Sequence, residues 1–224
     1  MNLLKKLSFL DWCAIILGVV LAAMIVTPNI RRARKPVIYL YSPEPIEVSI
    51  SLDVDGIITE TIPEYENSWQ VKTTPDGTIV KEHNFVDSEG NEISETRKFR
   101  YLYYEADIAV ESLPDEGWSV EKNALEPWMT TNLAKIGFNN REIRDFKDYW
   151  LAALNCSNFY NIYIMPDDFL EEKLRLDIYP EPDSVLRKLF YFEGTDRRKL
   201  ILPPAISPFE REGFVLVEWG GILQ

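Results

Sequence analysis

A long apolar stretch opens the chain. Residues 12–26 are almost entirely apolar, and no charged side chain lies between Asp11 and Arg31. A helix over residues 12–30 would be about 28 Å long, close to the roughly 30 Å hydrocarbon core of a bilayer. Trp12 and the flanking basic residues are typical of interfacial anchors. The pattern predicts a transmembrane helix within residues 1–30 and a basic juxtamembrane linker at residues 31–35.

A cleavable signal peptide is the alternative, because Lys5 and Lys6 resemble its basic first region. The apolar stretch continues past the small residues at which a peptidase would cut, which favours an uncleaved anchor. Two basic residues precede the helix and four follow it, and this bias favours a cytoplasmic domain.

Beyond residue 36, apolar and polar positions alternate, which is the pattern of strands with one buried face. Strands are predicted over residues 37–41, 46–54, 57–62, 69–73, 78–81 and 98–106. Asp55-Gly56 predicts a tight hairpin, and Pro75-Asp76-Gly77 predicts a second turn. Residues 87–92 read as a third loop. The first half of the domain is therefore expected to be an antiparallel sheet or a small sandwich.

Residues 121–138 and 139–154 change to a helical period. Gly137 is suited to end the first helix, and Asn139 with Glu142 forms a variant of the capping box that opens the second. Further strands are predicted at residues 160–165, 174–179, 185–193 and 214–219, with a short helix at 167–173. The expected fold class is α+β: a transmembrane helix, then an antiparallel sheet or sandwich domain with an inserted two-helix hairpin.

Charge divides the chain into two parts. The whole sequence has 24 basic and 36 acidic side chains, but the first 35 residues hold six of the bases and one acid. Residues 36–224, expected to form a single domain, therefore carry 18 basic and 35 acidic side chains, a net charge of −17. Such a surface repels phosphate, so no nucleic-acid partner is expected. It suits cations, basic partners or simple solubility.

Several ordered segments resemble an uncharacterised bacterial, envelope-associated family. Its members open their soluble domain with a KPVIYLYP-like segment and close on a GFxxVEWGG-like strand. The matching segments here are residues 35–41, 65–77, 101–105, 137–150, 182–183 and 213–221. The resemblance implies a shared fold, supplies no catalytic residues, and implies a domain outside the cytoplasmic membrane, against the charge bias.

Paired carboxylates are the main catalytic candidates. Glu105 and Asp107 lie among tyrosines and alternate on one strand, so their side chains would share a face. Glu218 stands beside Trp219. Carboxylates among aromatic rings are typical of glycosidase clefts. The alternative is that the rings face the core and the acids face water.

Other chemistry has less support in the sequence. The oxygen-bearing side chains of Asp53 and Asp55, and of Asp87, Glu89 and Glu92, are calcium candidates, but neither cluster matches the full EF-hand pattern. The chain has one histidine, His83, and two cysteines, Cys13 and Cys156, which is too few for a zinc site or an activated nucleophile. No cofactor or metal is therefore predicted.

These observations predict a membrane-anchored, non-enzymatic binding or structural module of the bacterial cell envelope. Its expected partners are the lipid bilayer, contacted through residues 12–30, and an unidentified protein or glycan of the envelope. The alternative function is a carboxylate-dependent envelope hydrolase that acts on glycans.

Overall fold

The computed structural model describes residues 29–224 except Asp87. Their elements, in chain order, are β1 (Ile30–Tyr41), β2 (Ile46–Val54), β3 (Gly56–Ile62), β4 (Trp69–Thr73), β5 (Ile79–Val86), β6 (Glu92–Phe99), β7 (Leu102–Ala109), β8 (Trp118–Glu121), the 3₁₀ turn η2 (Lys122–Ala124), α2 (Leu125–Ile136), α3 (Asn140–Ala153), β9 (Phe159–Ile164), α4 (Asp167–Lys173), β10 (Leu174–Tyr179), β11 (Ser184–Thr195) and β12 (Val215–Leu223).

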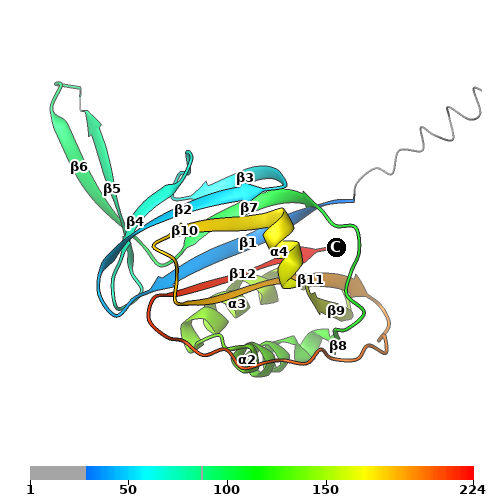
Figure 1. Ribbon diagram of the computed structural model, residues 1–224. Coiled ribbons are helices and arrows are strands. Elements are labelled where there is room, and N and C mark those ends of the chain that lie inside the picture. The colour runs from blue at the N-terminus through cyan, green and yellow to red at the C-terminus, as the bar shows by residue number, and fades with distance from the viewer. Residues whose placement is uncertain (1–28, 87) are drawn as a thin grey trace, which may run out of the picture.

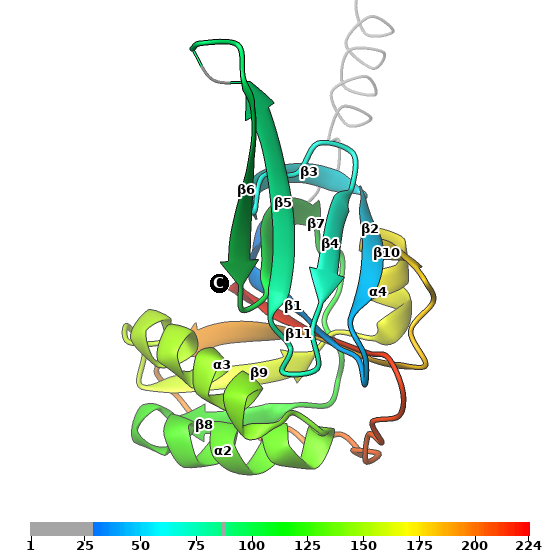
Figure 2. The same ribbon diagram turned by 90° about the vertical axis from the view of Figure 1, so that its left-hand side faces the viewer.

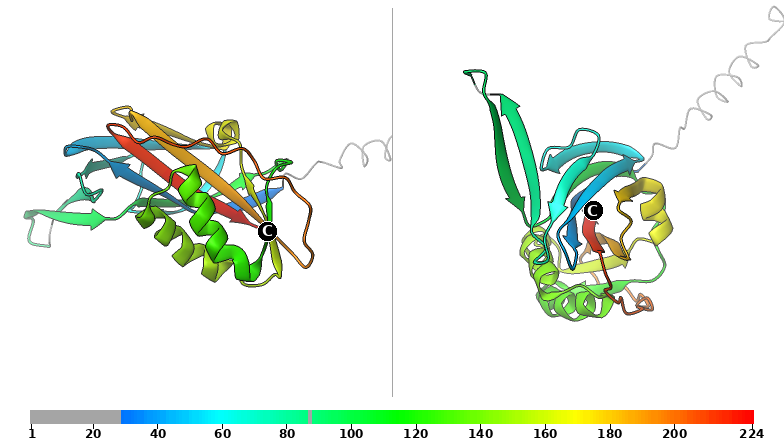
Figure 3. Two further views of the ribbon diagram at one scale, coloured as in Figure 1. Left: turned by 90° about the horizontal axis from the view of Figure 1, so that it is seen from below. Right: turned by 60° about the vertical axis from the view of Figure 1, so that its left-hand side comes forward.

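The strands form two sheets (Figure 1). Sheet A has the order β3-β7-β1-β12-β11-β9-β8, and sheet B has the order β10-β2-β4-β5-β6. Neighbouring strands are antiparallel except β11 and β12, which run parallel. Parallel neighbours need a long connection. Here it is residues 196–214, which we call the strap and which pass β8 and the end of α2 on the way back to the start of β12 (Figures 1 and 3).

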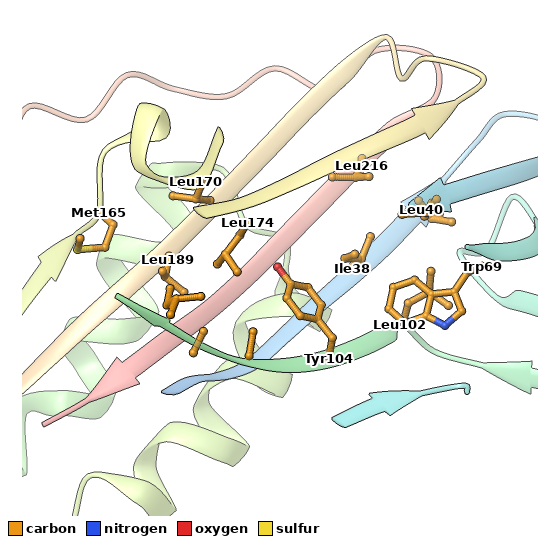
Figure 4. Packing of buried hydrophobic residues seen from close by; sticks show 14 of the residues in the cluster. Ile38, Leu40, Trp69, Leu102, Tyr104, Met165, Leu170, Leu174, Leu189 and Leu216 are labelled. Carbon is orange, nitrogen blue, oxygen red and sulfur yellow. The ribbon is translucent and has the colours of Figure 1, made fainter. Parts of the chain in front are cut away.

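Strand alternation creates two cores on the two faces of sheet A. Ile38 and Leu40 of β1 point between the sheets, where they pack with Trp69, Tyr104 and other buried side chains (Figure 4). Val37 and Tyr39 point the other way, into the core beneath the helices. The molecule therefore has three layers: sheet B, sheet A and a helical layer.

The helical layer is the predicted hairpin of α2 and α3 (Figure 2). Gly137 ends α2 in the left-handed conformation, with φ of 114°. The Asn139 side chain accepts hydrogen bonds from the backbone N–H groups of Arg141 and Glu142, and the Glu142 carboxylate accepts the Asn139 N–H. Both predicted caps are confirmed, so local signals placed these helices correctly.

The β5–β6 hairpin projects beyond the body of the molecule (Figures 2 and 3). Seven of the eight residues of β6 are exposed, which is consistent with an arm that no layer covers. The predicted strand at residues 98–106 is wrong. The extended conformation is interrupted at Arg100 and Tyr101, so the segment divides between β6, in sheet B, and β7, in sheet A.

The predicted hairpin at Asp55-Gly56 is also wrong. β2 belongs to sheet B, whereas β3 pairs with β7 in sheet A, so this turn passes the chain between sheets. Glycine is required there by a close approach, because a Cβ on Gly56 would lie 2.1 Å from the Asp107 carbonyl oxygen. The Pro75-Asp76-Gly77 turn joins β4 to β5 as expected, with Gly77 at φ of 74°.

The expected fold class needs correction. The described residues form a mostly β, two-sheet structure of twelve strands, with helices confined to the α2–α3 hairpin, α4 and one 3₁₀ turn. The α+β expectation underestimated the strand content. It treated β6 and β7 as one strand, and it did not recognise the β5–β6 hairpin.

The expected membrane helix and single-pass membrane localisation are corrected as well. Among the described residues, no helix is long and apolar enough to cross a membrane. Residues 30–35, predicted to end the membrane helix and form a linker, instead open strand β1. The rest of that prediction, including Cys13, lies outside the described residues.

Candidate functional site

The predicted carboxylates do not converge on one site. Glu105 and Asp107 share the face of β7 opposite Tyr104, as alternation predicts. Asp107 is engaged by Arg32, whose Nε and Nη2 donate to its two oxygens at 2.8 and 3.0 Å. The hydrogen bond and charge of Arg32 lower the pKa of Asp107 below its ordinary value. Asp107 is thus held as the anion of a surface ion pair.

Glu218 lies on the other face of sheet A, between the two sheets. Its side chain is 3% exposed and accepts hydrogen bonds from the Tyr104 hydroxyl and from Nε of Arg187, each at 2.6 Å. Figure 4 shows the Tyr104 hydroxyl pointing toward the part of the core that holds Leu174. Burial and the charge of Glu218 raise the pKa of Tyr104, so the phenol remains a donor.

Arg187 connects this buried pair to the surface. Its other nitrogens donate to the Leu174 carbonyl and, at 3.0 Å, to the exposed carboxylate of Glu171. Burial alone would lower the pKa of Arg187, but Glu218, Tyr104 and Glu171 outweigh it, and the pKa is raised. Glu218 is therefore a fully partnered interior charge, separated by the sheet from Glu105 and Asp107.

The calcium candidates are distributed over different partners. Asp53 pairs with Arg175 and Asp55 with Lys173, each at 2.7 Å. Glu89 and Glu92 lie at the tip of the β5–β6 arm, and Asp87 is outside the described residues. Across residues 29–224 without Asp87, no three His, Cys, Asp or Glu side chains are grouped to hold a metal. His83 lies on the arm, whereas Cys156 follows α3.

A different site arises where sheet A is incomplete beside β11. β11 pairs with β12 from Ser184 to Phe192, but with β9 only from Phe190 onward. The last bond on the β9 side runs from the Met165 N–H to the Leu189 carbonyl. No other described strand pairs with residues 184–188 on this edge.

The backbone of β11 shows which groups face this gap. The Ser184 N–H bonds toward β12, whereas the Leu189 carbonyl bonds toward β9. Successive residues of a strand direct their N–H and C=O groups to opposite edges, so those of Val185 and Arg187 face the gap. An unpaired strand edge is a template for pairing with another chain.

Two cavities flank this edge, one on each face of the sheet. The larger, of about 510 Å³, lies on the helical side. Most of the residues that line it are apolar, among them Ile136, Ile164, Met165, Pro166, Leu186, Ile206 and Phe209. The smaller, of about 160 Å³, includes Leu170, Glu171 and Arg187. Asp167, Val185, Leu186 and Lys188 line both. We call this combined space the edge groove.

A third cavity, of about 570 Å³, extends the edge groove toward β10. It shares Glu171, Val185 and Arg187 with the small cavity and adds Asp177, Glu181 and the exposed Tyr179. Sequence reasoning missed the whole site. The available signals in the sequence were Pro166, just past the end of β9, and the prolines of the strap that forms one wall, but neither shows which strand edge stays unpaired.

Comparisons with known proteins add little chemistry. No family model matches the chain, and no solved structure matches it. One similar protein, from Butyrivibrio fibrisolvens, is described as "Uncharacterized protein in bglA 3'region" and is 37% identical over 76 residues. The match covers 33% of this chain and 66% of that protein, just under two thirds of its length.

Proposed function

We propose that this protein is a non-enzymatic binding module that takes up an extended polypeptide segment as an added strand along residues 184–188 of β11. The observation that carries the proposal is the unpaired edge of β11 within a preformed groove. A peptide in this position would lie in line with β9 and bond to the main-chain groups of Val185 and Arg187.

The flanking cavities support an added strand. In strand addition, main-chain hydrogen bonds supply affinity, while pockets for alternate side chains supply specificity. The large cavity and the small one lie on opposite faces of β11 and meet at its edge. Successive side chains of an inserted strand would enter the two cavities in turn.

The hydrolase alternative lacks a comparable arrangement. Glu218 is buried with two partners, Asp107 is paired with Arg32, and the sheet separates the two acids. We also propose that the chain is a member of the uncharacterised bacterial family that it resembles. Two of the resembling segments, residues 35–41 and 213–221, fall largely on β1 and β12, which pair directly at the centre of sheet A.

The test compares two substitutions of Val185, whose N–H faces the groove. Val185→Pro removes that donor, and proline is tolerated where a strand N–H is not bonded within the sheet. Val185→Ala keeps the donor and is the matched control. Binding of the neutral peptide acetyl-Leu-Thr-Leu-Thr-Leu-Thr-amide to the full chain is measured by calorimetry. We expect Val185→Pro to raise the Kd about tenfold, because the peptide loses the hydrogen bond from the Val185 N–H and the adjacent main-chain bonds are weakened.

Val185→Ala should bind the peptide within about twofold of the unchanged chain. Val185 lines the edge groove, but this substitution keeps the backbone N–H and removes only two methyl groups of a side chain that is 47% exposed. Circular dichroism and the urea midpoint of both variants report whether the fold is retained. The proposal is overturned if the peptide does not bind the unchanged chain, or if a folded Val185→Pro variant binds it equally well.

A further inference from the structure

The edge groove has an apolar lining on one face of β11 and an acidic lining on the other. This contrast indicates which peptide side chains each face would accept. The inference rests on the proposed strand addition. On the helical side, the large cavity is walled by aliphatic and aromatic side chains from β9, β11, α2 and the strap. Its two charged side chains, Asp167 and Lys188, pair with each other at 2.6 Å. This side is therefore suited to large apolar side chains.

The side facing α4 and β10 is acidic. Glu171, Asp177 and Glu181 line its cavity together with a single basic side chain, Arg187. Arg187 is shared between two acids, Glu218 in the interior at 2.6 Å and Glu171 at 3.0 Å, so its one positive charge does not balance all the acids around it. Asp177 has only a long contact of 3.6 Å with Arg175. An excess of negative charge therefore remains at the mouth of this cavity.

The exposure of these acids makes them accessible to a ligand. The side chains of Glu171 and Asp177 are 61% and 62% exposed, and Glu181 is exposed as well. Exposed charges of one sign around a cleft attract ligands of the opposite sign and disfavour those of the same sign. The excess of acids over bases in the whole domain acts in the same direction.

We propose that the edge groove selects an extended segment in which large apolar side chains alternate with lysine or arginine. The apolar side chains enter the cavity beneath the strap, and the basic ones enter the acidic mouth between α4 and β10. The alternation follows from the two faces of a strand, because neighbouring side chains point to opposite sides.

The test uses three peptides of one length and alternation: acetyl-Leu-Lys-Leu-Lys-Leu-Lys-amide and its counterparts with threonine or glutamate in place of lysine. Calorimetry on the full chain should give a Kd about tenfold lower for the lysine peptide than for the threonine peptide, and a Kd at least about tenfold higher for the glutamate peptide. The lysine advantage should shrink as sodium chloride is raised, because salt screens exposed charges.

Variants assign the effect to the acidic mouth. The combined Glu171→Gln and Glu181→Gln variant should lose most of the lysine advantage while binding the threonine peptide unchanged. Glu64→Gln is the control, because Glu64 is an exposed acid that follows β3 at the other edge of sheet A. It should leave all three Kd values unchanged.

The results separate this inference from the proposed function. Equal Kd values for the three peptides, all weakened by Val185→Pro, would overturn the charge selection and leave the strand addition standing. If the chain prefers the lysine peptide and Val185→Pro changes none of the Kd values, strand addition is overturned. The charge selection at this groove is then overturned as well. A lysine advantage that persists in the Glu171 and Glu181 variant would also overturn the inference.

Discussion

At the residue scale, Glu218 shows how one side chain can fit two opposite interpretations. In the sequence it stands beside Trp219, as a carboxylate in a sugar-binding cleft would. In the structure, Trp219 points toward the helices, and Glu218 points between the sheets toward Arg187 and Tyr104. Its partners lie 31 and 114 positions away along the chain. Such distant pairing leaves no local signal, so the sequence could not distinguish a catalytic acid from an interior ion pair.

The interior pair makes a prediction about stability. Glu218→Gln should lower the free energy of unfolding by about 3 kcal/mol, because the buried guanidinium of Arg187 loses its closest counter-charge. Replacing both partners, with Arg187→Met and Glu218→Leu, should restore most of that loss, because no unpaired charge remains. Urea denaturation of the single and double variants measures both effects. A Glu218→Gln variant within about 0.5 kcal/mol of the unchanged chain would contradict this account.

At the element scale, local signals placed turns and caps well but did not show which strands pair. The helices of the hairpin, the turn at Gly77 and the short helix α4 all follow from residues that are close in sequence. Asp55-Gly56 carries an equally strong hairpin signal. There the competing requirement is tertiary, since the chain must cross to sheet A against the Asp107 carbonyl.

The cap of α3 gives a prediction at this scale. Asn139→Ala removes the side-chain acceptor for two backbone N–H groups and should lower the free energy of unfolding by about 1 kcal/mol. Asn139→Ser keeps an oxygen in the capping position and should cost only a few tenths of a kcal/mol. Chemical denaturation of the two variants provides the comparison. Equal losses for alanine and serine would show that the side chain stabilises the protein through contacts other than the cap.

At the scale of the whole molecule, the fold follows from burying both faces of sheet A. Strand alternation predicted a sheet or sandwich, and two helical segments predicted a layer beside it. The site could not be predicted in the same way. β9 ends at Ile164, which pairs with Phe190, whereas β11 begins six residues earlier, at Ser184. The gap therefore depends on the register between the two strands. The strands at residues 46–54, 69–73 and 174–179 were predicted at their observed bounds, whereas β1 and β5 are longer than predicted and β6 and β8 were missed. The register between β9 and β11 is a tertiary property with no local signal.

Charge distribution was more readily predicted than geometry. The acid excess of residues 36–224 follows from the sequence alone, where it left cations, basic partners and simple solubility as open interpretations. The structure adds a place where an excess of acids over bases meets an unpaired strand edge: Glu171, Asp177 and Glu181 lie there with Arg187 as the one basic side chain of the cavity lining. The acidic surface is thereby linked to one groove rather than to the molecule in general.

Amide hydrogen exchange along β11 of the full chain is the most direct test of the central claim. In the free protein, the N–H groups of Val185 and Arg187 should exchange faster than those of Leu186 and Lys188, which bond to β12. Saturation with the leucine–threonine peptide should slow exchange at Val185 and Arg187 and leave Leu186 and Lys188 almost unchanged. Equal protection of all four amides in the free protein, or a saturating peptide that leaves Val185 and Arg187 unprotected, would contradict the proposed strand addition.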